Sequence, residues 1–128
     1  MRIGELAREA GVTTKTVRYY ESVGLLTATR LANGYRDYDA DAVALVREIR
    51  GVSALGIRVE QSRPFLDCLT TGHAQGDDCP DALLAYRAAI AEFDSRIAEL
   101  TARRDALREL LESASARPEA RCEFSPAH

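Results

Sequence analysis

The sequence predicts a mainly α-helical protein, in which a small head of short helices and one β-hairpin precedes a long C-terminal helix. Three observations lead to this prediction. Two short segments of helical periodicity meet at Gly11, the pair Asn33-Gly34 separates two short runs, and a heptad pattern of apolar residues extends from Leu83 to Leu111. Such patterns predict, in that order, a helical pair, a hairpin and a helix with a coiled-coil stripe.

The composition indicates a folded protein outside the membrane. Hydrophobic residues make up 46% of the 128 residues, which excludes wholesale disorder. No apolar run approaches the roughly 20 residues that a membrane-spanning helix needs. Glu5 lies where a signal peptide would have its apolar segment. We therefore expect a cytoplasmic protein.

The net charge of −3 is distributed unevenly along the chain. Residues 1–70 contain 10 Lys and Arg against 9 Asp and Glu, whereas residues 71–128 contain 7 against 11. The segment from Thr13 to Arg36 holds four basic residues and one acidic residue. Because nucleic-acid-binding proteins concentrate positive charge where they meet phosphate, this segment is the candidate binding surface.

The first segment predicts a short amphipathic helix that stops at Gly11. A second helix begins at Thr13 or Thr14, whose hydroxyl groups suit an N-cap, and Gly24 ends it. Two short helices joined by a tight turn form a helix-turn-helix, whose second helix enters the major groove of DNA. The apolar residues of the first helix recur at helical spacing and are Ile3, Leu6, Ala7 and Ala10.

The second helix carries a basic, aromatic face. Lys15, Arg18 and Tyr19 fall on a shared side at helical spacing, while Val17 and Leu25 can face inward. This combination predicts a surface that meets DNA.

A hairpin follows this helix. Asn33-Gly34 is the strongest short hairpin signal, because both residues tolerate positive φ. The hairpin would carry Arg30 and Arg36 as a wing beside the second helix.

Two further helices complete the head. Asp39 or Asp41 can cap a third helix that runs to about Val52. Another follows through Leu69, and Pro64 predicts that it starts late or bends, since proline is tolerated only in a first turn. Residues 70–78 hold two glycines and no apolar residue larger than alanine, which predicts a loop. The head is thus a DNA-binding domain of residues 1–70, with a linker at 71–79.

A long helix from Pro80 to about Ala114 is the second organising element, and it would measure roughly 50 Å. It cannot bury its apolar stripe alone, so residues 80–114 are expected to dimerise, and residues 115–128 lose the periodicity and form a tail. Arg104 is the one polar interruption of the stripe, which consists of Leu83, Tyr86, Ile90, Phe93, Ile97, Leu100, Leu107 and Leu111.

These motifs together resemble one known family. The stretch IGELAREAGVTTKTVRYYESVGLL, then NGYRDY, then a long terminal helix resembles the MerR family of bacterial transcription regulators. The resemblance implies a winged helix-turn-helix and an antiparallel coiled coil between two subunits. It also implies that the homodimer binds a pseudo-palindromic operator in double-stranded DNA, within a promoter spacer whose shape it alters for RNA polymerase.

The resemblance also assigns residue roles. Arg18 is the first candidate for a base or near-base contact. Of the neighbouring pair Tyr19 and Tyr20, one is expected to point outward and the other inward. The full set of expected DNA-binding residues is Thr14, Lys15, Arg18, Tyr19, Tyr20, Tyr35, Arg36 and Arg58.

Cysteine placement is the main indication of a signal. Cys79 lies at the start of the long helix, where metal sensors of this family place a ligating cysteine. An antiparallel partner would bring Cys122 and His128 near it, and His73, Asp77 or water would have to complete a tetrahedral site for a Zn, Cd, Hg or Pb ion. Cys68 is expected to be a small buried apolar side chain. Because three cysteines are an odd number in a chain without an export signal, no structural disulfide framework is expected.

Other interpretations remain beside the metal-responsive regulator. One is a thiol- or redox-responsive regulator of the same fold, and another is a regulator that needs no signal. A third is a coiled-coil interaction module with no role on DNA. The sequence supports no enzyme, since it has no catalytic triad, phosphate-binding loop or paired carboxylates.

Overall fold

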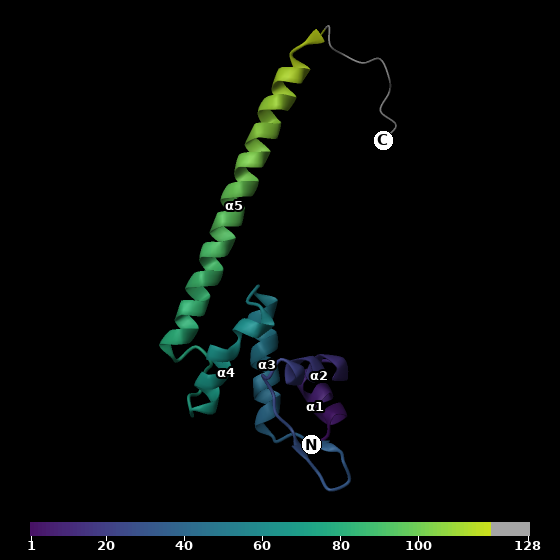
Figure 1. The fold of residues 1–128 in the computed structure, drawn as a ribbon. Coiled ribbons are helices and arrows are strands. Elements are labelled where there is room, and N and C mark those ends of the chain that lie inside the picture. The colour runs from purple at the N-terminus through teal and green to yellow at the C-terminus, as the bar shows by residue number, and fades with distance from the viewer. Residues whose placement is uncertain (119–128) are drawn as a thin grey trace. The chain divides into compact units, whose positions relative to one another are not determined.

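The computed structural model describes residues 1–118 and consists of helices with one small two-stranded sheet (Figure 1). The chain divides into two units, Met1–Ala89 and a second that starts at Ile90. This is the predicted fold class, a winged helix-turn-helix followed by a long C-terminal helix. In chain order, the elements are α1 (Ile3–Ala10), α2 (Thr14–Ser22), β1 (Thr29–Arg30), β2 (Arg36–Asp37), α3 (Asp41–Ala54), the 3₁₀ helix η1 (Val59–Gln61), α4 (Arg63–Thr70) and α5 (Pro80–Ser115).

The turn between α1 and α2 is built by two residues with distinct roles. Gly11 caps α1 with a φ of 75°, in the left-handed region that glycine adopts without steric cost. Thr13 caps α2, and its side-chain oxygen accepts a hydrogen bond of 3.1 Å from the amide of Thr16. The predicted helix-turn-helix therefore has a cap at both sides of its turn.

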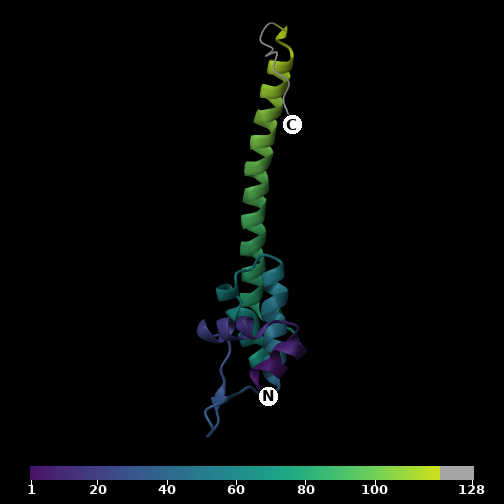
Figure 2. The ribbon, with the colours of Figure 1, turned by 90° about the vertical axis from the view of Figure 1, so that its right-hand side faces the viewer.

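The main core of the first unit lies where α1, α2 and α3 meet. Helix α3 contacts both α1 and α4, and Figures 1 and 2 show these short helices gathered around it. Leu6, Val17, Tyr38, Val46 and Ile49 are fully buried in this core. Burial of such side chains stabilises a fold by about 1.5–3 kcal/mol each. None of the helices in residues 1–118 has the length and hydropathy to cross a membrane.

A smaller cluster attaches the start of α5 to the head. Val52 of α3, Phe65 of α4 and Ala82 of α5 are buried together, with Tyr86 packed against them. The rings of Phe65 and Tyr86 lie 5.1 Å apart, centroid to centroid. Helix α4 begins at Arg63, so Pro64 falls in its first turn, which confirms the predicted late start.

The hairpin forms where the sequence predicts it, but with a different turn. The register pairs Arg30 with Arg36, and the amide of Gly34 bonds to the carbonyl of Leu31 at 2.9 Å. Gly34 has a φ of 87°, whereas Asn33 does not take a positive φ. The asparagine instead accepts a 3.1 Å hydrogen bond from the amide of Tyr35 through its side chain. The loop is therefore a three-residue hairpin connection with glycine in the left-handed position.

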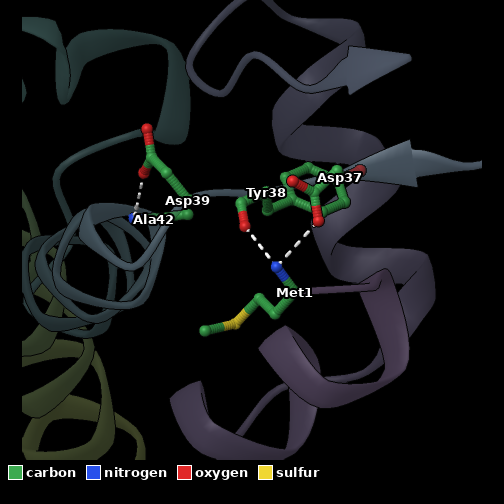
Figure 3. A network of polar contacts seen from close by, with 5 residues as sticks. All are labelled: Met1, Asp37, Tyr38, Asp39 and Ala42. Atoms are coloured by element: carbon green, nitrogen blue, oxygen red, sulfur yellow. Dashed lines mark hydrogen bonds and ion pairs between the residues drawn. The ribbon is translucent and has the colours of Figure 1, made fainter. Parts of the chain in front are cut away.

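The start of the chain holds the hairpin in place. The Met1 amine donates to Oδ1 of Asp37 at 2.9 Å and to the carbonyl of Tyr38 at 2.6 Å (Figure 3). Next to them, Oδ1 of Asp39 accepts a 3.2 Å hydrogen bond from the amide of Ala42 in the first turn of α3. The exit of the hairpin is thereby fixed between the beginnings of α1 and α3.

Candidate functional site

The exposed face of α2 carries the basic side chains that the sequence indicates. Lys15, Arg18 and Tyr19 are exposed, and Thr14 is half-buried beside them. The opposite face packs inward through Val17. Helix α2 is therefore amphipathic, with a basic exposed face and an apolar buried face.

The two neighbouring tyrosines lie on opposite faces, so Tyr20 leaves the candidate set. Its side chain is 5% exposed and belongs to the core, whereas Tyr19 is 43% exposed. Burial raises the pKa of Tyr20, with the Arg50 charge acting in the opposite direction. The inclusion of Tyr20 among the expected DNA-binding residues is wrong, because Tyr20 is buried in the core. Adjacent helical residues point about 100° apart, so Tyr19 can be exposed while Tyr20 is not.

Tyr19 connects α2 to η1. Its hydroxyl donates a 2.6 Å hydrogen bond to Oε1 of Glu60. That bond raises the pKa of Tyr19 and lowers the pKa of Glu60. Arg58, two residues before Glu60, is exposed and also lowers the pKa of Glu60 through its charge.

The hairpin side chains contact the helices instead of extending freely. Nε of Arg36 lies 3.4 Å from Oε1 of Glu21 in α2. The guanidinium carbon of Arg2 lies 4.1 Å from the ring centroid of Tyr35, a cation–π distance. Tyr35 remains 55% exposed. The wing is therefore held to both α2 and the start of α1.

A groove of about 860 Å³ opens between α1, α2 and the hairpin. It gathers positive charge in a protein whose net charge is negative. The acidic residues among its lining are Glu5 and Asp37; Asp37 is paired with the Met1 amine, and of the arginines Arg36 is paired with Glu21. Such a concave basic surface suits a polyanion. Five arginines line it: Arg2, Arg8, Arg18, Arg30 and Arg36. Sequence reasoning missed Arg2 and Arg8, since it treated their segment only as an amphipathic helix.

A cluster of potential metal ligands lies between α4 and α5. One ligand atom from each of Cys68, His73 and Cys79 lies within 4.8 Å of the others. The structure also joins Cys68 and Cys79 as a disulfide, with their Cα atoms 5.8 Å apart. The side chain of Cys68 is buried, as expected, but its sulfur is bonded to Cys79. The expectation that the chain has no structural disulfide is therefore wrong, and Cys68 is more than a small apolar side chain. The loop brings together cysteines 11 residues apart, which no local sequence signal indicates.

The linker loop is held against the head by several contacts. Gly76 is buried, and a Cβ atom there would lie 3.2 Å from the Phe65 carbonyl and still closer to the Glu48 carboxylate. Tyr86 donates a 3.0 Å hydrogen bond to Oδ2 of Asp77. Burial raises the pKa of Glu48, and the charge of Asp77 adds to that rise. Asp77 therefore faces Tyr86 and Glu48 in this structure.

The other expected metal ligands cannot be placed. Cys122 and His128 lie outside residues 1–118, which the structure describes. A site shared by Cys79 and this tail therefore stays a prediction.

The predicted dimerisation stripe is largely exposed along α5. Tyr86 is an exception, since it packs against Phe65 in the first unit. Further along, residues 100–111 line a shallow apolar groove of about 470 Å³ flanked by three arginines. The exposed members of the stripe are Leu83, Ile90, Phe93, Ile97, Leu100, Leu107 and Leu111, at 41% to 67% of their surface.

Comparison with known proteins places these features in context. The family model described as "MerR family regulatory protein" matches residues 2–38. The HTH-type transcriptional regulator HmrR of Rhizobium leguminosarum bv. viciae is 36% identical over 111 residues, which cover 87% of this chain and 84% of that protein.

Two solved structures are similar to most of the chain. The transcription regulator PbrR691 from Ralstonia metallidurans CH34, in complex with lead(II), matches with a TM-score of 0.72 and 31% identity over 95% of this chain and 94% of that one. HiNmlR, a regulator lacking the sensor domain and bound to promoter DNA, shares the fold with a TM-score of 0.51 and 22% identity over 90% and 92%.

Proposed function

This chain belongs to the MerR family of transcription regulators, and on that premise we propose that it binds a pseudo-palindromic operator as a homodimer and alters the shape of a promoter spacer when a small signal arrives. Its macromolecular partners are double-stranded DNA, a second copy of itself and RNA polymerase at the promoter. The relatives are transcription regulators and not enzymes.

The basic groove is the single observation that carries the DNA-binding proposal. Five arginines gather around it although the chain has a net charge of −3. Such a concentration of charge fits phosphate, and the exposed face of α2 beside it suits the major groove. Thr14, Lys15, Arg18 and Tyr19 would act from α2, with Tyr35 and Arg36 from the hairpin and Arg58 near η1.

The exposed apolar stripe of α5 supports dimerisation. Ile97 is 61% and Leu100 62% exposed. A stripe of such apolar side chains along a 36-residue helix indicates that a partner helix covers it. A second copy fits, because its stripe has the same heptad spacing. The antiparallel arrangement follows from the family resemblance.

The proposed action on DNA is a change of shape. Two copies of the basic groove, joined through α5, impose a geometry on the DNA between their half-sites. Bending a site of this kind costs of order 1–6 kcal/mol, a range that ligand binding can supply. A signal that changes the geometry of the dimer would therefore change how well RNA polymerase engages the promoter.

The proposed signal is a divalent ion of the Zn, Cd, Hg or Pb type. Thiol and imidazole groups at the start of α5 are ligands for such soft cations. The lead(II) complex of PbrR691, at 31% identity, supports the same class of ligand. A thiol-responsive regulator is a second candidate, which the Cys68–Cys79 disulfide favours.

Selection of DNA by the purified full-length protein tests the regulator function. The protein is mixed with a random pool of double-stranded DNA, and the bound fragments are sequenced and footprinted. We expect enrichment of a site with two-fold symmetry. The Arg18→Ala variant should lose this enrichment, while Arg87→Ala, at an exposed position on α5 outside the groove, should keep it. Enrichment of no sequence by the wild type, at any salt concentration, would refute the proposal.

A further inference from the structure

We propose that Cys68, His73 and Cys79 of a single subunit bind a zinc-type divalent cation, at a site that needs neither Cys122 nor His128. The inference rests on the proposed regulator function only for its biological use, and it specifies which residues bind the signal. The three ligands come from α4, from the loop after it and from the residue before α5.

The distances suit a tetrahedral thiolate–imidazole site. Ligand atoms of the three residues lie within 4.8 Å of one another, and Nδ1 of His73 lies 3.7 Å from Sγ of Cys79. Zinc bonds of about 2.3 Å to sulfur and 2.0–2.1 Å to nitrogen place two such ligand atoms about 3.6 Å apart at a tetrahedral angle. The sulfur atoms of Cys68 and Cys79, which are bonded in the structure, would separate to a similar spacing in the reduced protein.

The position of His73 distinguishes a metal site from a simple disulfide. A disulfide needs two sulfur atoms and no imidazole, yet Nδ1 of His73 also lies 3.2 Å from the Cys68 carbonyl and 3.3 Å from Oγ1 of Thr71. These contacts hold the ring next to the sulfur pair. Without a cation, Nδ1 can bond to the Cys68 carbonyl only as a donor. Cation binding at Nδ1 would replace that hydrogen bond and leave the ring proton on Nε2, which the exposed position of the ring permits.

The site has a closed side and an open side. Cys68 is 1% exposed, and its sulfur contacts the carbonyl of Gln75 at 3.4 Å. His73 is exposed and Cys79 is half-buried, so a cation can enter from their side. Three protein ligands leave the fourth tetrahedral position to water or another ligand, the arrangement of an exchangeable site.

The two acidic residues of the loop that supplies His73 accept hydrogen bonds from other residues of the protein. Oδ2 of Asp78 accepts a 3.0 Å hydrogen bond from the amide of Gln75, and Asp77 accepts one from Tyr86. Both carboxylates are thus engaged in holding the loop. The donor set of two sulfurs and one nitrogen selects zinc, cadmium, mercury or lead over magnesium or calcium.

Binding would act at the junction that positions α5. The ligands lie at both ends of the loop between α4 and α5, so a bound cation fixes where α5 begins relative to α4. Oxidation to the Cys68–Cys79 disulfide uses the same two sulfur atoms and therefore excludes the cation. The reduced protein is the form that binds metal.

Titration of the reduced full-length protein with Zn²⁺, and with Co²⁺ as a spectroscopic probe, tests the inference. We expect one ion per subunit and thiolate-to-cobalt charge-transfer absorption. Cys68→Ser, Cys79→Ser and His73→Ala should each weaken Zn²⁺ binding at least about tenfold, since each removes one ligand. Cys122→Ser and His128→Ala serve as matched controls and should bind like the wild type.

Three outcomes would overturn the inference. The His73→Ala substitution is exposed and leaves the core intact. If its Zn²⁺ affinity equals that of the wild type, His73 is not a ligand. Loss of binding in Cys122→Ser with retention in Cys68→Ser assigns the cation to Cys79 and the tail. Absence of Zn²⁺ binding by the wild type, with its thiols shown to be reduced, leaves the pair a disulfide only.

The test is separable from the proposed function. Zn²⁺ and Co²⁺ binding is measured without DNA, and Arg18→Ala should bind both ions like the wild type while its operator binding is weakened. If the wild type binds metal but no DNA, the regulator function fails and the site stands. If the wild type binds DNA but no metal, the metal site fails and the regulator function stands.

Discussion

The hydroxyl of Tyr19 donates a 2.6 Å hydrogen bond to the Glu60 carboxylate, across 41 residues of sequence. This bond connects the exposed face of α2 to η1, the element that follows Arg58. Tyr19 remains 43% exposed while its hydroxyl group is hydrogen-bonded. The bond thus orients a side chain on the surface that we propose for DNA.

Tyr19→Phe should lower the melting temperature at neutral pH, because it deletes this hydrogen bond. The bond lowers the pKa of Glu60 in the folded protein, so its contribution is present above the ordinary value of 4.5 and is lost as pH falls through the lowered pKa. The raised pKa of Tyr19 means that the contribution is also lost as pH rises through that pKa, above 10.0.

Thermal unfolding of wild type and Tyr19→Phe across acidic to alkaline pH measures this effect. Tyr35→Phe is the matched control, since Tyr35 forms no side-chain hydrogen bond within residues 1–118. A difference in melting temperature that stays constant at low pH would contradict the assignment to the Glu60 carboxylate.

Arg18→Ala should weaken specific DNA binding by about 1–3 kcal/mol, as expected for the loss of a base-contacting arginine. Lys15→Ala should weaken binding to all sequences alike and reduce the slope of log K against log salt by about 1, as expected for one lost phosphate contact. Fluorescence anisotropy over a series of salt concentrations separates the two roles. Equal effects of Lys15→Ala and Arg87→Ala would place Lys15 outside the interface.

Replacing Ile97 and Leu100 together with aspartate should convert the protein to a monomer. Both positions belong to the exposed stripe of α5, and charges there oppose burial against a partner helix. Sedimentation velocity gives the oligomeric state. Ser95→Asp with Ala102→Asp adds the same charge on the opposite face and should leave the dimer intact. A dimer that survives the first pair would exclude this stripe as the interface.

Two glycine substitutions should shift stability in opposite directions. Gly11→Ala forces an L side chain into a φ of 75° and places Cβ 2.9 Å from Nη1 of Arg50, so it should destabilise the fold by at least about 1 kcal/mol. Gly51→Ala lies within α3 with nothing within 4 Å of the added atom, and it should stabilise by about 0.5–1 kcal/mol. Urea unfolding of both variants measures the free energies. Equal changes in the free energy of unfolding for the two variants would contradict the requirement for glycine at position 11.

Local signals in the sequence predicted most of the elements. The hydroxyl of Thr13, the glycine at position 11 and the proline at position 64 each act within a few residues, so their effects on helix ends could be read directly. The heptad from Leu83 to Leu111 likewise depends on spacing alone. Even so, the conformation of the hairpin turn differed, because the side chain of Asn33 satisfies the amide of Tyr35 and leaves positive φ to Gly34.

Contacts between distant residues were decided only by the tertiary structure. Which of Tyr19 and Tyr20 faces the core depends on the rotation of α2 against α1 and α3, and the core takes Tyr20. Arg2 and Arg8 join the basic groove because the Met1 amine holds the hairpin beside α1.

The sequence by itself determined the family, the helix-turn-helix, the wing and the long helix with its exposed stripe, because each depends on spacing within one segment. Only the tertiary structure brought Cys68 and His73 to Cys79. Their meeting depends on how the loop folds back between α4 and α5, around a buried Gly76. No periodic pattern in the sequence indicates how this loop folds. The sequence therefore predicted only a small apolar side chain at Cys68, whereas the tertiary structure places its sulfur in a candidate site.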